Sequence, residues 1–102
     1  MNKIDFVRLE EILYCKSNGR YTIFFLVGNK ELVSSINLGK YENLLDSDFF
    51  YRVHKSYIVN LMHVSSISRK PEVYCNMVNG TLVPIAKRRL KRLFKFLDIE
   101  RS

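Results

Sequence analysis

Residues 49–60 read FFYRVHKSYIVN and contain neither glycine nor proline. Aromatic and β-branched side chains dominate this stretch, and such residues favour extended backbone. Apolar and mixed positions alternate at first, as in a strand with one apolar face. The expected apolar face holds Phe49, Tyr51 and Val53. The alternation stops after His54 and resumes at Tyr57, so we predict two short strands, or one bent strand.

The expected bend joins a cation to two hydrogen-bonding side chains: His54, Lys55 and Ser56. Apolar residues anchor it on both sides, which suits a contact with a ligand. The same corner is compatible with a solvated lysine and a structural histidine, because most polar corners of a sheet bind nothing. These residues alone leave both interpretations open.

The length of 102 residues predicts one domain, residues 1–102. A hydrophobic content of 47% is too high for disorder, and no apolar run approaches the roughly 20 residues that span a bilayer. The N-terminus lacks the apolar stretch of a secretory signal, so we expect a cytoplasmic protein that does not enter the membrane. Cys15 and Cys75 are expected to be reduced core residues, although a disulfide is possible in an oxidising compartment. Two cysteines and two histidines without close spacing argue against a zinc site, and no cofactor is expected.

The chain is strongly basic, with a net charge of +7 from 17 Lys and Arg against 10 Asp and Glu. Six cations fall within nine positions near the C-terminus: Lys87, Arg88, Arg89, Lys91, Arg92 and Lys95. This balance favours a polyanionic partner, namely DNA, RNA or an anionic membrane.

Elsewhere the pattern predicts short strands joined by turns. Extended segments are expected at 3–9, 13–16, 21–27, 31–35, 64–68, 73–78 and 81–85, with a connector or single helical turn at 9–12 and another at 60–63. The continuous apolar character of 21–27 predicts burial on both faces. Asn18-Gly19 and Asn79-Gly80 are typical of hairpin turns.

Two short helices complete the expected elements. Asn37 is a candidate cap for a helix through Leu45, which ends at residues 46–48. From Ala86 onward, Leu90, Leu93, Phe94 and Leu97 form the apolar stripe of a second helix. We therefore predict a mainly β domain with antiparallel pairing, eight or so short strands and two short helices.

Three polar sites interrupt the expected sheet, each at a strand junction. The first includes Lys16, Asn18, Arg20 and Tyr21; the second is His54, Lys55 and Ser56; the third is Lys87, Arg88 and Arg89. Lysine and arginine at such sites neutralise phosphates and can also reach guanine O6 and N7. Cations at a helix N-terminus oppose the helix dipole at a cost of about 0.3–1 kcal/mol, which an anionic ligand would remove. The third site therefore favours a nucleic-acid contact over a solvated helix face.

Three segments resemble LytTR DNA-binding domains: residues 12–22, 50–60 and 79–88. The resemblance implies small antiparallel sheets without a helix-turn-helix, and loops that enter successive major grooves. It also implies the output half of a bacterial two-component response regulator, normally behind a receiver domain for which this chain has no room. Paired direct repeats in duplex DNA, and a dimer on them, are implied as well. Lys87 stands where many members have serine and Lys55 stands at a variable position, so the resemblance leaves open which cation contacts a base.

An enzyme is not expected, because the sequence has no Ser/His/Asp spacing, glycine-rich phosphate loop, HExxH motif or clustered acids. The alternative is a module that binds RNA or single-stranded nucleic acid. Six aromatic side chains are candidate stacking platforms for bases: Tyr14, Tyr21, Phe24, Tyr51, Tyr57 and Tyr74.

Overall fold

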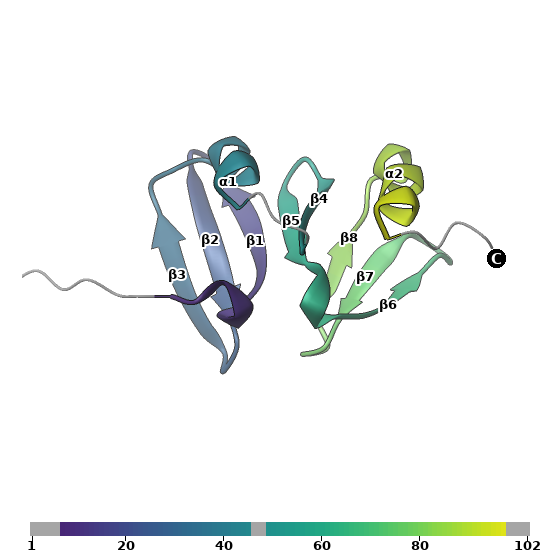
Figure 1. The fold of residues 1–102 in the computed structure, drawn as a ribbon, viewed down its shortest axis with the longest axis horizontal. Coiled ribbons are helices and arrows are strands. Elements are labelled where there is room, and N and C mark those ends of the chain that lie inside the picture. The colour runs from purple at the N-terminus through teal and green to yellow at the C-terminus, as the bar shows by residue number, and fades with distance from the viewer. Residues whose placement is uncertain (1–6, 46–48, 98–102) are drawn as a thin grey trace, which may run out of the picture.

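The computed structural model describes residues 7–45 and 49–97, which form two antiparallel sheets and two α-helices (Figure 1). The strands are β1 (Ile12–Asn18), β2 (Tyr21–Leu26), β3 (Lys30–Ser34), β4 (Phe50–His54), β5 (Tyr57–Asn60), β6 (Val64–Ser68), β7 (Tyr74–Met77) and β8 (Leu82–Pro84). The α-helices are α1 (Leu38–Leu44) and α2 (Lys87–Leu97), and two 3₁₀ helices are η1 (Leu9–Glu11) and η2 (Leu61–His63). The predicted fold class is therefore confirmed: mainly β, antiparallel, with two short helices that do not form a helix-turn-helix.

The two sheets lie side by side along the long axis of the molecule (Figure 1). The larger sheet has the strand order β3-β2-β1-β5-β4, and the smaller one has the order β6-β7-β8. Helix α1 packs near β1 and β5, whereas α2 packs against β4 and the smaller sheet. Asn37 caps α1 as predicted, because its side chain accepts a hydrogen bond from the backbone N–H of Lys40 at 2.9 Å.

The β4–β5 hairpin belongs to both hydrophobic cores. Val53 and Val59 are fully buried in a core with Leu93 of α2. Phe50 and Ile58 are buried in a second core, beneath α1. Both faces of the hairpin are therefore covered, and this feature joins the two halves of the molecule.

Because both cores share the hairpin, the predicted faces of β4 are wrong. The two strands are present, with the turn at Lys55 and Ser56, but Phe49 is 49% exposed while Phe50 is buried. A register shift between Arg52 and His54 also interrupts the expected alternation.

Three further predictions need adjustment. Asn18 pairs with Tyr21, so the hairpin turn is Gly19-Arg20, with Gly19 at a φ of 63°. Strand β2 is only partly buried, because Tyr21 is 53% exposed. The predicted first strand falls partly outside the described residues, and its end at Leu9 begins η1, the helical turn expected there. The predicted helix end at 46–48 also lies outside the described residues.

Both cysteines are free thiols, as expected. Cys15 lies in one core and Cys75 in the other, and both are completely buried. Burial raises the pKa of Cys15 to about 12 and that of Cys75 to about 11. Both thiols are therefore protonated at neutral pH and poorly reactive.

Candidate nucleic-acid interface

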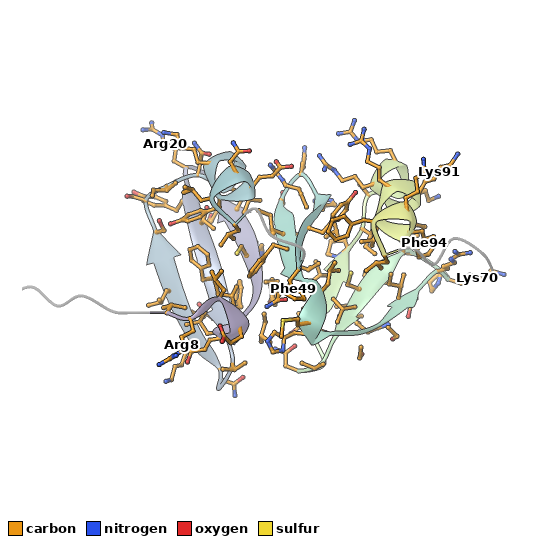
Figure 2. The ribbon with its side chains drawn as sticks, viewed as in Figure 1. Arg8, Arg20, Phe49, Lys70, Lys91 and Phe94 are labelled. Carbon is orange, nitrogen blue, oxygen red and sulfur yellow. The ribbon has the colours of Figure 1, made fainter. Side chains whose placement is uncertain are left out.

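The three polar sites lie along one long edge of the molecule. In Figure 1 this upper edge carries the β1–β2 turn, the β4–β5 turn and the beginning of α2. We call it the basic edge. Figure 2 shows the side chains of Arg20 and Lys91 on this edge, and that of Arg8 on the opposite side.

A backbone hydrogen bond joins the first site to the second. The N–H of Ser17 donates to the carbonyl oxygen of Ser56 at 2.9 Å, which holds the end of β1 against the β4–β5 turn. The ammonium of Lys16 lies 5.9 Å from the ring centroid of Tyr57, close enough for a cation–π contact. The two sites are therefore fixed relative to each other.

Arg52, in the middle of β4, holds the β4–β5 turn from beneath. Its guanidinium donates from Nε to the carbonyl oxygen of His54 at 3.2 Å, and from Nη2 to the carbonyl oxygen of Lys55. Its Nη1 forms an ion pair with Glu42 of α1 at 2.8 Å. Sequence reasoning did not single out Arg52, although a charged residue inside an apolar strand is unusual enough to draw attention.

His54 shapes the same turn through its ring. Its Nδ1 accepts a hydrogen bond from the N–H of Ser56 at 3.1 Å, which requires Nδ1 to be unprotonated and assigns the proton of the neutral ring to Nε2. The pKa of His54 is lowered, mainly by burial and then by the positive charges of Lys55, Arg89 and Arg52. His54 and Ser56 therefore stabilise the β4–β5 turn, and Lys55 is exposed at the tip of that turn.

The third site lies at the start of α2. Lys87 is the first residue of α2, so Lys87, Arg88 and Arg89 form the first turn of that helix. The preceding residue is anchored to β4, because the N–H of Ala86 donates to the carbonyl oxygen of Val53 at 2.8 Å. Arg89 turns inward and donates from Nη1 to the carbonyl oxygen of Arg52 at 3.3 Å.

The ten predicted site residues therefore divide into two groups. Seven are exposed on the basic edge: Lys16, Asn18, Arg20, Tyr21, Lys55, Lys87 and Arg88. The other three, His54, Ser56 and Arg89, are half-buried and hold the turn and the start of α2 in place. Within residues 7–45 and 49–97, the one ion pair is Arg52–Glu42, so no described carboxylate neutralises the exposed cations.

Most of the proposed stacking platforms contact other aromatic rings of the protein. Tyr14 is 7% exposed and stacks on Phe25 with ring centroids 4.5 Å apart. Phe24 contacts Tyr41 edge to face, and Tyr51 packs on Phe96 of α2. Tyr21 is the candidate whose ring is largely exposed.

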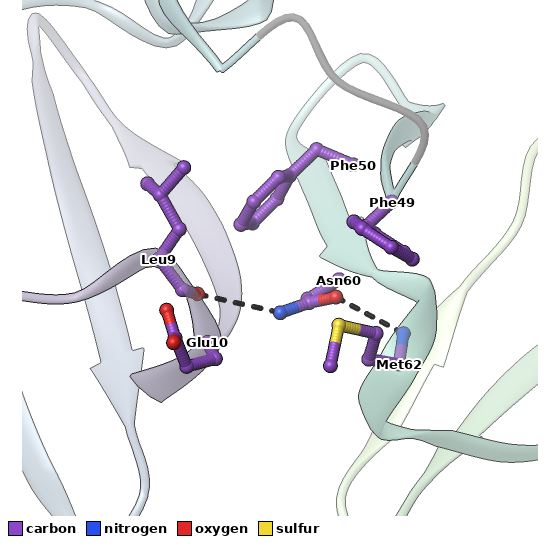
Figure 3. A pocket seen from close by; sticks show the side chains of 6 residues that line it. All are labelled: Leu9, Glu10, Phe49, Phe50, Asn60 and Met62. Carbon is purple, nitrogen blue, oxygen red and sulfur yellow. Dashed lines mark hydrogen bonds between the residues drawn. The ribbon is translucent and has the colours of Figure 1, made fainter.

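A hollow of about 410 Å³ lies away from the basic edge, between η1 and η2 (Figure 3). Its lining is mainly apolar, and the buried Asn60 amide forms its floor. That amide donates to the carbonyl oxygen of Ile12 at 2.9 Å and accepts from the N–H of Met62 at 3.0 Å, so it links η2 to β1. This hollow lacks the cations that a nucleic acid requires.

The part of the chain that the structure describes contains neither a candidate metal site nor a candidate membrane span. No three His, Cys, Asp or Glu side chains there lie close enough to hold a metal ion. No helix there is long and apolar enough to cross a membrane.

Several known proteins resemble this chain. The LytTr DNA-binding domain profile matches residues 2–98. The CO-responsive transcriptional regulator RcoM of Rhodospirillum rubrum is 31% identical over 99 residues, covering 93% of this chain and 41% of that protein. The heme-containing CO-sensing transcriptional regulator RcoM 1 of Paraburkholderia xenovorans is 27% identical over 101 residues, covering 96% of this chain and 38% of that protein.

A solved structure has the same fold. The LytTr DNA-binding domain of a putative methyl-accepting/DNA response regulator from Bacillus cereus superimposes with a TM-score of 0.82 at 26% identity, covering 89% of this chain and 84% of that one. The chain spans about two fifths of the length of the curated relatives that it matches.

Proposed function

The chain belongs to the LytTR family of DNA-binding domains, and from this premise we propose that it binds duplex DNA sequence-specifically within a bacterial transcriptional regulator. The observation that carries this proposal is the basic edge. Lys16, Arg20, Lys55, Lys87 and Arg88 are exposed there without a described carboxylate partner. A linear array of unpaired cations matches the linear array of phosphates on a duplex.

We assign base contacts to cations on rigid supports and phosphate contacts to the rest. Lys55 stands on a turn held by Arg52, His54 and the backbone of Ser17. Lys87 and Arg88 stand on the first turn of α2, which Ala86 anchors to β4. Rigid placement allows a side chain to discriminate base edges, whereas mobile cations only attract phosphates. In this arrangement the β1–β2 turn and the start of α2, the outermost sites of the basic edge, enter successive major grooves, and the β4–β5 turn lies between them.

The larger assembly is also part of the proposal. The curated relatives are transcriptional regulators more than twice as long as the aligned region, and their CO sensing belongs to those longer proteins. For this chain we propose the DNA-binding role, in the cytoplasm, on paired direct repeats occupied by two copies. A receiver domain is one candidate for a sensory partner.

Selection of bound sequences from a random duplex pool tests the proposal. The expected outcome is an enriched motif that recurs as a direct repeat, spaced by a whole number of helical turns of about 10 base pairs. Affinity for that duplex should exceed affinity for single-stranded DNA and RNA of equal length. Equal or tighter binding to the single strands would support the alternative, an RNA or single-strand module. The burial of Tyr14 and the contacts of Phe24 and Tyr51 with other rings of the protein argue against it.

A further inference from the structure

A shallow groove extends from the basic edge between α2 and the β6–β7 connection. Its volume is about 460 Å³, and it is lined by Arg69, Val73, Lys87, Leu90, Lys91 and Phe94. Half of these residues are cations and half are apolar. We call it the α2 groove. Figure 2 shows Lys91 and Phe94 at the same end of the molecule as the β6–β7 connection, where Lys70 is labelled.

The three cations of the α2 groove lie close together without a described acid to neutralise them. Lys87 and Lys91 are one helical turn apart on the same face of α2, where like charges repel each other and destabilise a helix. Arg69 approaches the same hollow from the other side. The acid of this connection, Glu72, lines the neighbouring hollow with His54 and is absent from the lining of the α2 groove. An anion in the groove would relieve this repulsion.

The Arg69 guanidinium is held in a defined place. Its Cζ lies 4.8 Å from the ring centroid of Phe94, in cation–π contact. Stacking on a ring occupies one face of the guanidinium plane and leaves its N–H groups free to point outward. Such an arginine is ready to donate two parallel hydrogen bonds to a phosphate.

The groove is continuous with the proposed DNA site, because Lys87 lines both the α2 groove and the hollow beside His54. A duplex that contacts Lys87 therefore has its backbone close to the groove. The apolar floor of Val73, Leu90 and Phe94 suits the hydrocarbon surface of deoxyribose between phosphates. A nucleic-acid backbone fits this combination better than a free phosphate ion does.

We propose that the α2 groove is a further DNA contact, in which Arg69 and Lys91 grip the sugar-phosphate backbone outside the base pairs that the basic edge reads. The inference rests on the proposed function. It predicts that affinity depends on the length of the flanking duplex and not on the flanking sequence.

The test uses two duplexes that share one selected core sequence. The short duplex ends at the core, and the long one extends by about one helical turn, roughly 10 base pairs, at each end with arbitrary sequence. The unmodified protein should bind the long duplex more tightly at fixed salt. Arg69→Ala should remove this advantage, leave affinity for the short duplex unchanged, and reduce the slope of log affinity against log salt on the long duplex by about 0.9.

Two variants complete the experiment. Phe94→Leu keeps an apolar floor but removes the aromatic platform, so it should weaken the dependence of affinity on duplex length. Arg69→Lys keeps the positive charge, so it should retain part of that dependence. Arg8→Ala is the matched control, because Arg8 is an exposed arginine on the opposite side of the molecule and should leave both affinities unchanged. Thermal melting followed by circular dichroism checks that each variant is folded.

Two outcomes would overturn the inference. The first is an Arg69→Ala protein whose affinity depends on duplex length as fully as that of the unmodified protein. In that case the α2 groove would be a binding site for an acidic protein segment and not for DNA. The second is an equal loss on the long and short duplexes. Failure of the unmodified protein to prefer duplex over single strands would instead refute the proposed function, so the two failures are distinguishable.

Discussion

Replacement of Arg52 by alanine is expected to reduce both the stability of the domain and its discrimination between DNA sequences, although Arg52 itself contacts no DNA in the proposed complex. Its guanidinium supports the carbonyl groups of His54 and Lys55 and pairs with Glu42. Without the guanidinium, the β4–β5 turn loses the two hydrogen bonds that hold its carbonyl groups in place. Lys55 then samples many positions, and only some of them reach a base.

The magnitude for stability follows from the lost contacts. The carboxylate of Glu42 is 48% exposed, so the ion pair contributes about 0.2–1 kcal/mol. Water reaches the turn and can replace the guanidinium at the two carbonyl groups, so each of those bonds contributes about 1 kcal/mol. The free energy of unfolding should therefore fall by roughly 2–3 kcal/mol, which lowers the Tm of a domain of this size by about 10–20 °C.

The effect on DNA binding has an upper bound. Arg52 acts through Lys55, so Arg52→Ala cannot remove more than the Lys55 base contact contributes. That contact is worth about 1–3 kcal/mol, or roughly 5- to 160-fold in affinity for the cognate duplex. Affinity for a scrambled duplex should change much less.

The assay is a double-mutant cycle measured on cognate and scrambled duplexes at a temperature where all variants are folded. In a Lys55→Ala background, Arg52→Ala should reduce discrimination no further. Glu42→Gln is the matched control, because it removes only the ion pair and should leave discrimination nearly intact. Additive effects of Arg52→Ala and Lys55→Ala, with equal losses on both duplexes and a salt slope lower by about 0.9, would show that Arg52 binds a phosphate itself and would refute the reasoning.

Three further predictions concern the β4–β5 hairpin, α2 and pH. Val53→Ala, at a fully buried position, should lower the free energy of unfolding by about 1–3 kcal/mol in urea titrations, whereas Lys55→Ala should leave Tm unchanged and weaken DNA binding. The reverse result would mean that Lys55 supports the fold and that Val53 does not. Lys87→Ala should reduce the binding free energy for the cognate duplex by about 1–3 kcal/mol and relax the preference at one base position. Lys95→Ala, later in α2, should reduce the affinities for cognate and scrambled duplexes equally, and by less. Equal losses of affinity for both duplexes in Lys87→Ala would show that Lys87 contacts a phosphate. The pKa of His54 is lowered in the folded state, so the neutral ring's contribution to stability is fully present above about pH 6.5 and is lost as the pH falls through the lowered pKa. The free energy of unfolding in urea should therefore be smaller at pH 5.5 than at pH 7.5, and His54→Gln should reduce this difference.

Local signals in the sequence predicted most of the elements, because those elements depend on local chemistry. The cap at Asn37 and the apolar stripe of α2 were both identified, and Leu93 of that stripe is completely buried. The hairpin at Asn18 was found, but the turn lies one residue later, because strand pairing extends to Asn18. Turn chemistry locates a hairpin, and the pairing of its strands decides its register.

The errors arise where two distant parts of the chain meet. The faces of β4 were misassigned because the hairpin has a core on each side, so alternation of apolar and polar residues was the wrong criterion. The ion pair of Arg52 was missed because its partner, Glu42, lies ten residues earlier in the chain, in α1.

The hairpin shared by both cores also has a consequence for the DNA. Because the packing of β4 and β5 fixes the three polar sites relative to one another, the protein has little freedom to adjust their spacing. In the proposed complex, the duplex must supply the adjustment through twist and curvature. Such distortion costs different amounts for different base steps, so base pairs that lie between the sites and touch no side chain would still influence affinity. The operator would then be recognised partly through its mechanical compliance, and the stiffness of this small protein would itself be a source of selectivity.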